Sequence, residues 1–160
     1  MSKIRFTIPE KAVAKERART STKVRLEGDK ITKITKTKTP PRTRAWEEYV
    51  SLISRQAAVR HGIRSPLTGA ITLGCVFYLP PTKAVLKSNR DDIEKETLPH
   101  TGDPDLSNLI KSIEDACEGV LWVDDCQIDS YGPVDDKKTS KIYSNRPRVE
   151  VEVSYGERSF

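Results

Sequence analysis

The chain has 160 residues, of which 36% are hydrophobic and 32% charged, and its formal net charge is +5. This length fits one domain with one modest core. No stretch approaches the roughly 20 apolar residues of a membrane span, and nothing at the start predicts a secretory signal, so we expect neither. The three cysteines match no paired metal-binding spacing. We therefore expect reduced thiols, with Cys75 and Cys117 packed in the core.

Charge is distributed unevenly along the chain. Residues 1–64 hold 17 basic and 6 acidic side chains, whereas residues 65–160 hold 11 basic and 17 acidic ones. One interpretation is a nucleic-acid-binding surface joined to an acidic, cation-binding site. The other is a solvated surface of mixed sign, and charge alone does not choose between them.

The first half of the chain predicts a strand, a basic segment and a helix. Residues 4–8 alternate apolar and polar side chains, which predicts a short strand. Residues 11–40 are basic and poor in apolar side chains, so we interpret them as a flexible basic loop or a hairpin. A helix then begins with Thr43 as its expected N-cap and ends near His61, whose expected role is a C-terminal cap. Its apolar stripe consists of Trp46, Tyr49, Val50, Ile53 and Ala57.

The second half predicts strands around one strongly amphipathic helix. That helix runs from about Asp105 to Glu118, because apolar residues recur there at offsets of three, four, seven and eleven. Together these elements predict a single α+β domain over residues 1–160, with a mixed β-sheet and helices packed on it. The other expected segments are a strand over 71–79, a mostly polar loop with a short helical piece over 82–102, a short strand over 120–123 that continues or pairs with 127–131, a polar loop over 135–145 and a last strand over 149–153.

Four aspartates flank the amphipathic helix and the short strand that follows it. They are Asp103, Asp105, Asp124 and Asp125. A helix followed by an adjacent strand can gather such carboxylates into one site of hard oxygen ligands, which Mg²⁺ and Mn²⁺ prefer. The alternatives are an N-cap for Asp105 and a polar turn for Asp124 and Asp125. Successive strand residues point to opposite faces, so only one of Asp124 and Asp125 can face the site, and the residues alone do not say which.

The polar face of the same helix carries a lysine that could act in phosphate chemistry. Lys111 and Asp115 are four residues apart and can pair along the helix surface. Lys111 could also stabilise negative charge that develops on a phosphate or leaving oxygen. A solvated helix face is the simpler interpretation. No glycine-rich phosphate loop is present, and the two histidines, His61 and His100, support no Ser/His/Asp arrangement; His100 could contact DNA or have no role.

Three segments resemble the signature of RusA-type Holliday junction resolvases. They are residues 104–111, residues 114–116 and residues 120–128. The family pattern is P-D-L-D-N-L-x-K, then D-A, then a short apolar strand, then D-D-x-Q-I/V. Flanking segments that also look like members of the group are residues 6–9, 15–19, 100–101 and 146–151, so the resemblance covers nearly the whole chain.

The resemblance implies a cytoplasmic, bacterial or phage-encoded homodimer that nicks four-way DNA junctions symmetrically in a Mg²⁺-dependent reaction, with Mn²⁺ as a substitute. Asp105, Lys111 and Asp125 match the catalytic positions of the motif. Asp105 and Asp125 would then bind the metal, with Asp103 and Asp124 in support. The DNA-binding side chains expected from the basic segment are Lys11, Lys15, Arg17, Arg19, Lys23 and Arg25.

One motif position departs from the family pattern. Ser107 stands where the family has its second aspartate, which removes a negative charge and should lower Mg²⁺ affinity. A second hypothesis is therefore a RusA-like protein that binds branched DNA but cuts it poorly. A third is a nucleic-acid-binding module without chemistry, which predicts aromatic side chains exposed on a sheet. The aromatic candidates for such stacking are Phe6, Phe77, Tyr78 and the two tryptophans.

Overall fold

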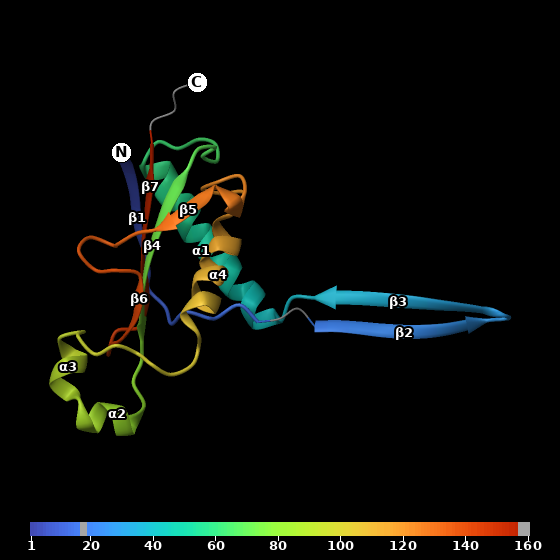
Figure 1. Ribbon diagram of the computed structural model, residues 1–160, viewed down its shortest axis with the longest axis horizontal. Coiled ribbons are helices and arrows are strands. Elements are labelled where there is room, and N and C mark those ends of the chain that lie inside the picture. The colour runs from blue at the N-terminus through green and yellow to red at the C-terminus, as the bar shows by residue number, and fades with distance from the viewer. Residues whose placement is uncertain (17–18, 157–160) are drawn as a thin grey trace.

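The core of the fold is a five-stranded mixed sheet, seen in a computed structural model that describes residues 1–16 and 19–156 (Figure 1). β7 lies between β1 and β4 and is antiparallel to both. The other edge of β4 pairs in parallel with two short strands in succession, β5 and then β6. This arrangement confirms the expected α+β class. The strands are β1 (Ser2–Ile8), β4 (Ile71–Leu79), β5 (Ile128–Tyr131), β6 (Ser140–Tyr143) and β7 (Arg148–Tyr155).

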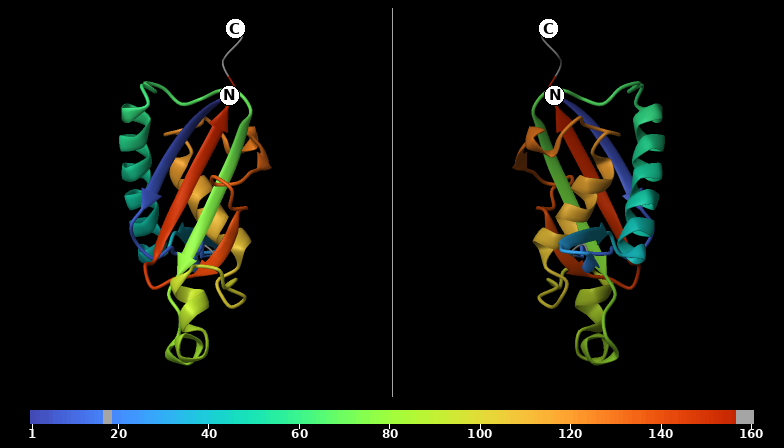
Figure 2. Two further views of the ribbon diagram at one scale, coloured as in Figure 1. Left: turned by 90° about the vertical axis from the view of Figure 1, so that its left-hand side faces the viewer. Right: turned by 90° about the vertical axis from the view of Figure 1, so that its right-hand side faces the viewer.

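Two long helices, α1 (Pro41–Arg60) and α4 (Leu106–Cys117), cover one face of this sheet (Figure 2). The alternation of β7 buries its valines against them, and the apolar stripe of α4 is buried in the same core. Trp46 of α1 donates its indole N–H to Ser112 Oγ of α4 at 3.1 Å, which joins the helices inside the core. The charged face of α4 is therefore left on the outside. Among the described residues, no helix combines the length and apolar character that a membrane span needs.

The opposite face of the sheet carries an ion-pair cluster around Glu96. Arg148 donates from Nη1 and Nη2 to the two Glu96 carboxylate oxygens at 2.7 and 3.0 Å, and Ser144 Oγ donates to Oε2 at 2.6 Å. The Arg148 guanidinium also lies 3.7 Å from the centre of the Tyr78 ring. The hydrogen bonds from Arg148 lower the pKa of Glu96 from 4.5 to about 2, although burial acts in the opposite direction.

The basic segment forms a hairpin that projects from the body (Figure 1). Its strands are β2 (Arg19–Glu27) and β3 (Lys30–Lys38), joined by a two-residue turn in which Gly28 has a φ of +59°. A positive φ is a conformation that glycine adopts without steric cost. Of the two alternatives left open by the sequence, a loop and a hairpin, the structure has the hairpin.

Two sequence-based expectations were wrong in detail. α1 begins at Pro41 with Pro40 as its N-cap residue, so Thr43 is a buried helical residue rather than the cap. Proline suits the first helical position because the N–H it lacks would be unpaired there. Residues 120–123 form no strand, because the chain reverses directly after α4: residues 119–121 form a turn, and Trp122 makes only isolated β-bridges, with Leu67 and Glu118.

The two polar segments also contain more regular structure than expected. Residues 82–102 include two short helices, α2 (Lys83–Ser88) and α3 (Arg90–Glu94). Thr82 caps α2 by accepting from the Val85 N–H at 3.3 Å, and Ile93 anchors α3 in the interior. Residues 135–145, expected as a loop, contain β6.

The Glu96 cluster predicts a specific acid sensitivity. A carboxyl with a lowered folded-state pKa adds stability above its unfolded pKa, near 4.5, and that stability is lost as the pH falls toward about 2. Glu96→Gln should therefore lower the free energy of unfolding at pH 7 and flatten its pH dependence below pH 4.5. Glu94→Gln, an exposed carboxyl on α3, is the control. Denaturant titrations from pH 7 to pH 2 measure both, and equal profiles for Glu96→Gln and the wild type would contradict the assignment.

Candidate active site

The turn after α4 returns the chain alongside the helix end. Gly119 has a φ of +78° and donates its N–H to the Trp122 carbonyl at 2.7 Å. The Leu121 N–H donates to the Cys117 carbonyl at 2.9 Å. A short 3₁₀ helix, η1 (Asp125–Gln127), follows at once. This tight reversal brings Asp125 next to the last turns of α4.

Asp125 is held through both of its carboxylate oxygens. The buried indole of Trp122 donates to Oδ1 at 2.9 Å, and Lys111 donates to Oδ2 at 3.3 Å. Because the indole has no freedom inside the core, it fixes the orientation of the carboxylate. Lys111 and Asp125, expected from the resemblance to act together, are thus in contact.

Lys111 belongs to a chain of ion pairs that joins four segments of the protein. Its Nζ lies 3.0 Å from Asp115 Oδ1, and Lys15 Nζ lies 3.0 Å from Asp115 Oδ2. Lys15 also contacts Glu47 Oε1 of α1 at 2.7 Å. The hydrogen bond to Asp115, followed by that to Asp125, raises the pKa of Lys111 above its ordinary value. Lys111 therefore keeps its positive charge throughout the physiological pH range.

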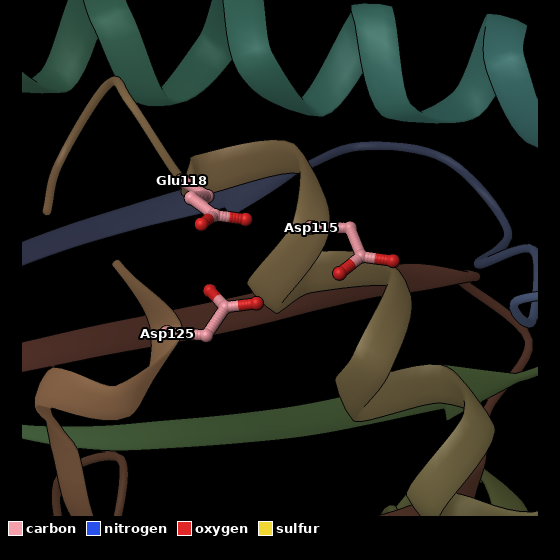
Figure 3. Close-up of side chains that lie close together, drawn as sticks. All are labelled: Asp115, Glu118 and Asp125. Atoms are coloured by element: carbon pink, nitrogen blue, oxygen red, sulfur yellow. The ribbon is translucent and has the colours of Figure 1, made fainter. Parts of the chain in front are cut away.

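Three carboxylates converge at this end of α4 (Figure 3). Asp115 and Glu118 come from the helix and Asp125 from η1, and one oxygen of each lies within 4.8 Å of the others. The Asp125 charge raises the pKa of Glu118, the most exposed of the three, because like charges are crowded together. Such a cluster is stabilised by a cation. Carboxylate oxygens are the ligands that Mg²⁺ and Mn²⁺ prefer, so the donor set fits a divalent ion.

The structure divides the four aspartates that were expected to form one site. Asp105 is the N-cap residue of α4, and a helix rises about 1.5 Å per residue. Asp105 thus lies roughly 15 Å along the axis from Asp115, and Asp103 precedes it. The predicted gathering assumed a strand after the helix, whereas the tight turn brings Asp125 to the other end of α4.

Asp124 has a structural role instead. Its Oδ1 accepts from the Cys126 N–H at 2.8 Å, and the Gln127 side chain accepts from the Asp124 N–H at 2.9 Å, which forms a capping box at η1. The hydrogen bond from the Cys126 backbone N–H lowers the pKa of Asp124. Of the adjacent pair, Asp125 alone belongs to the carboxylate cluster.

Asp115 and Glu118 were not recognised as metal-ligand candidates from the sequence. The sequence did contain a signal for them, since Lys111, Asp115 and Glu118 follow one another at spacings of four and three, which places them on one helix face. These side chains form a carboxylate cluster only together with Asp125, which the turn after α4 brings next to them. Ser107 is exposed one turn before Lys111 on the same helix face.

The expected DNA-binding side chains lie in three settings. Lys11 is exposed, but Lys15 is engaged by Glu47 and Asp115. Lys23 and Arg25 are exposed on the hairpin, where Arg25 lies 3.4 Å from Glu27. Arg17 lies outside the described residues, and Arg19 is the first residue of β2.

The histidines and aromatic side chains have packing roles. His61 ends α1, and its Nδ1 lies 2.8 Å from the Ala57 carbonyl oxygen, which confirms the expected cap. His100 is half-buried against Tyr143, with ring centres 4.4 Å apart, and burial lowers its pKa. The candidates for base stacking are buried in the interior, which removes the support for a stacking platform. They are Phe6, Trp46, Phe77, Tyr78 and Trp122.

Comparison with known families connects this geometry to an activity. Residues 9–154 match the family described as endodeoxyribonuclease RusA. The chain belongs to the RusA endodeoxyribonuclease family. It is also 31% identical over 153 residues to an uncharacterized protein, YqaN, of Bacillus subtilis strain 168, with 94% of this chain and 95% of the relative aligned. The family resemblance inferred from the motifs is thereby confirmed.

The cluster makes a prediction about metal binding without DNA. Glu118→Gln should weaken Mn²⁺ binding by at least about tenfold, because it removes one of three converging carboxylates. Asp91→Asn, which neutralises an exposed carboxylate on α3, is the matched control, and Asp105→Asn tests the alternative site at the other end of α4. Isothermal titration calorimetry measures all three variants. A loss of affinity in Asp105→Asn with none in Glu118→Gln would contradict this site.

Proposed function

We propose that this member of the RusA family is a metal-dependent, structure-specific endodeoxyribonuclease that resolves four-way DNA junctions by paired symmetric nicks in recombination and repair. The observation that carries the proposal is the contact of Lys111 with Asp125 beside two further carboxylates, in a chain that matches the family over residues 9–154. The proposed metal is Mg²⁺, with Mn²⁺ as a substitute, and the geometry favours Asp115, Glu118 and Asp125 as its ligands.

The roles of the residues follow from their positions. A divalent cation bound here would supply a polarised water and stabilise the leaving oxygen of the scissile phosphate. Trp122 holds Asp125 in its orientation through the indole N–H. Lys111 remains protonated, and its ammonium stabilises the negative charge that develops on the phosphate. Asp105 is kept as a proposed catalytic residue because of the resemblance.

A homodimer is part of the proposal because of the symmetry of the substrate. A four-way junction offers two equivalent strands to cut, and one small site reaches only one of them. A two-fold symmetric pair of chains would present two such sites to one junction.

The decisive experiment is nicking of a synthetic four-way junction in Mg²⁺. The wild type should cut paired, symmetry-related strands. Asp125→Asn and Lys111→Gln should each reduce the rate by at least about 100-fold, and Asp105→Asn should also abolish cutting. Asp125→Asn should retain or tighten junction binding, because a charge that repels phosphate is gone. Asp91→Asn on α3 is the matched control for charge removal and should cut normally.

A second candidate function rests on Ser107. A chain that binds the junction but does not cut it in Mg²⁺ or Mn²⁺ would support a branched-DNA-binding protein and would contradict the nuclease. If the wild type cuts like its Asp125→Asn variant, the assigned site is wrong.

Ser107 also provides a prediction of its own. If it stands at a metal-binding position, Ser107→Asp should lower the Mg²⁺ concentration for half-maximal nicking, since it restores a negative charge one turn from Lys111. If the Ser107 hydroxyl only caps the start of the helix, the aspartate would cap it about as well. The Mg²⁺ concentration for half-maximal nicking would then be unchanged. The Mg²⁺ dependence of Asp103→Asn, measured alongside, tests whether Asp103 already supplies that charge. In that case Asp103→Asn would be as damaging as Asp105→Asn.

A further inference from the structure

The hairpin has two chemically different faces, which its register defines. Residues directly opposite in an antiparallel pair share a face, and successive residues alternate between faces. Lys23 pairs with Ile34 and Glu27 with Lys30, whereas Val24 pairs with Lys33. We call the face that carries Lys23 and Glu27 the basic face. Its charged members with described side chains are Lys23, Arg25, Glu27, Lys30, Lys36 and Lys38. The other face carries Thr22, Val24, Leu26, Ile31, Lys33 and Thr35.

The basic face is exposed and projects away from the body of the protein (Figure 1). The described side chains of this face include five cations and Glu27, which lies near Arg25, so these side chains carry a net charge of +4. Strands of nine residues span about 30 Å at roughly 3.3 Å per residue. An isolated two-stranded hairpin is only marginally stable in water, and the lysines gathered on one face repel one another. A polyanion lying along this face would remove that repulsion.

The segment that leads into the hairpin runs beside α4, and its Lys15 side chain reaches the candidate active site. Lys15, four residues before β2, contacts Asp115 at 3.0 Å, and its N–H donates to the Asn108 carbonyl of α4 at 3.0 Å. After β3, the chain enters α1 at Pro41, and Glu47 of α1 contacts the same lysine. A ligand bound along the hairpin would therefore extend toward α4, the helix that carries Lys111.

Duplex DNA is the polyanion that matches these dimensions. It carries one negative charge per roughly 1.7 Å of axis, so an arm of about 30 Å runs beside about nine base pairs. Lysine and arginine contacts of this kind go to phosphates and position DNA without reading its sequence. We propose that the basic face of the hairpin binds the backbone of a duplex arm next to the cleaved phosphate, while the opposite face does not contact DNA. This inference rests on the proposed function for its choice of DNA.

The test compares two lysines of one strand. Lys36→Gln removes a charge from the basic face, and Lys33→Gln removes the same charge from the opposite face three residues away. Binding to a four-way junction and to linear duplex is measured without divalent metal, so cleavage does not interfere. Lys36→Gln should reduce the slope of log K against log salt by about 0.9, and Lys33→Gln should leave it unchanged. The triple variant Lys23→Gln/Lys30→Gln/Lys36→Gln should reduce it by about 2.7.

Two results would overturn the inference. One is an equal effect, or none, of Lys36→Gln and Lys33→Gln on the salt slope, with circular dichroism showing that both variants are folded. The other is a triple variant that binds DNA normally but changes its oligomeric state in sedimentation, which would assign the basic face to a second copy. If Lys36→Gln lowers the salt slope and Lys33→Gln does not, but the wild type nicks no four-way junction, this inference stands and only the proposed cleavage is contradicted.

Discussion

The candidate site depends on the hydrogen bonds that Trp122 and Lys111 donate to the two carboxylate oxygens of Asp125. The indole belongs to the core and the lysine to the outer face of α4, so one carboxylate connects the interior to the charged surface. The turn at Gly119 makes this contact possible by reversing the chain within a few residues. Without that reversal, Asp115 and Glu118 would be two ordinary charges on a solvated helix.

The amphipathic character of α4 serves folding and function on opposite sides. One side buries Leu109 and Ile113 under the sheet. The outer side presents Lys111 and Asp115, and tertiary contacts position rather than bury them. Tyr131 of β5 adds a further connection, because its hydroxyl donates to Glu114 of α4 at 2.5 Å, and burial raises the pKa of Tyr131 to about 12. The rigid core thus fixes the position of a polar, open site.

Sequence reasoning succeeded where local periodicity decides the structure. The helix over residues 106–117 and the strand with alternating valines were predictable because each buries one face. The turn over residues 119–121 was not, since the apolar side chains of residues 120–123 fit a strand equally well and only packing against residue 67 and α4 selects the turn. The partnership of Lys15 with Asp115 joins positions 100 residues apart, and no local pattern encodes it. The resemblance identified Lys111 and Asp125, but their carboxylate neighbours emerged only from the fold.

The most direct test of the central claim is anomalous diffraction from crystals of the wild-type protein grown with Mn²⁺. The account predicts an anomalous peak between the carboxylates of Asp115, Glu118 and Asp125, with the Lys111 ammonium displaced from Asp125. A peak at the N-terminal end of α4, bound by Asp103 and Asp105 and absent from the predicted cluster, would contradict it.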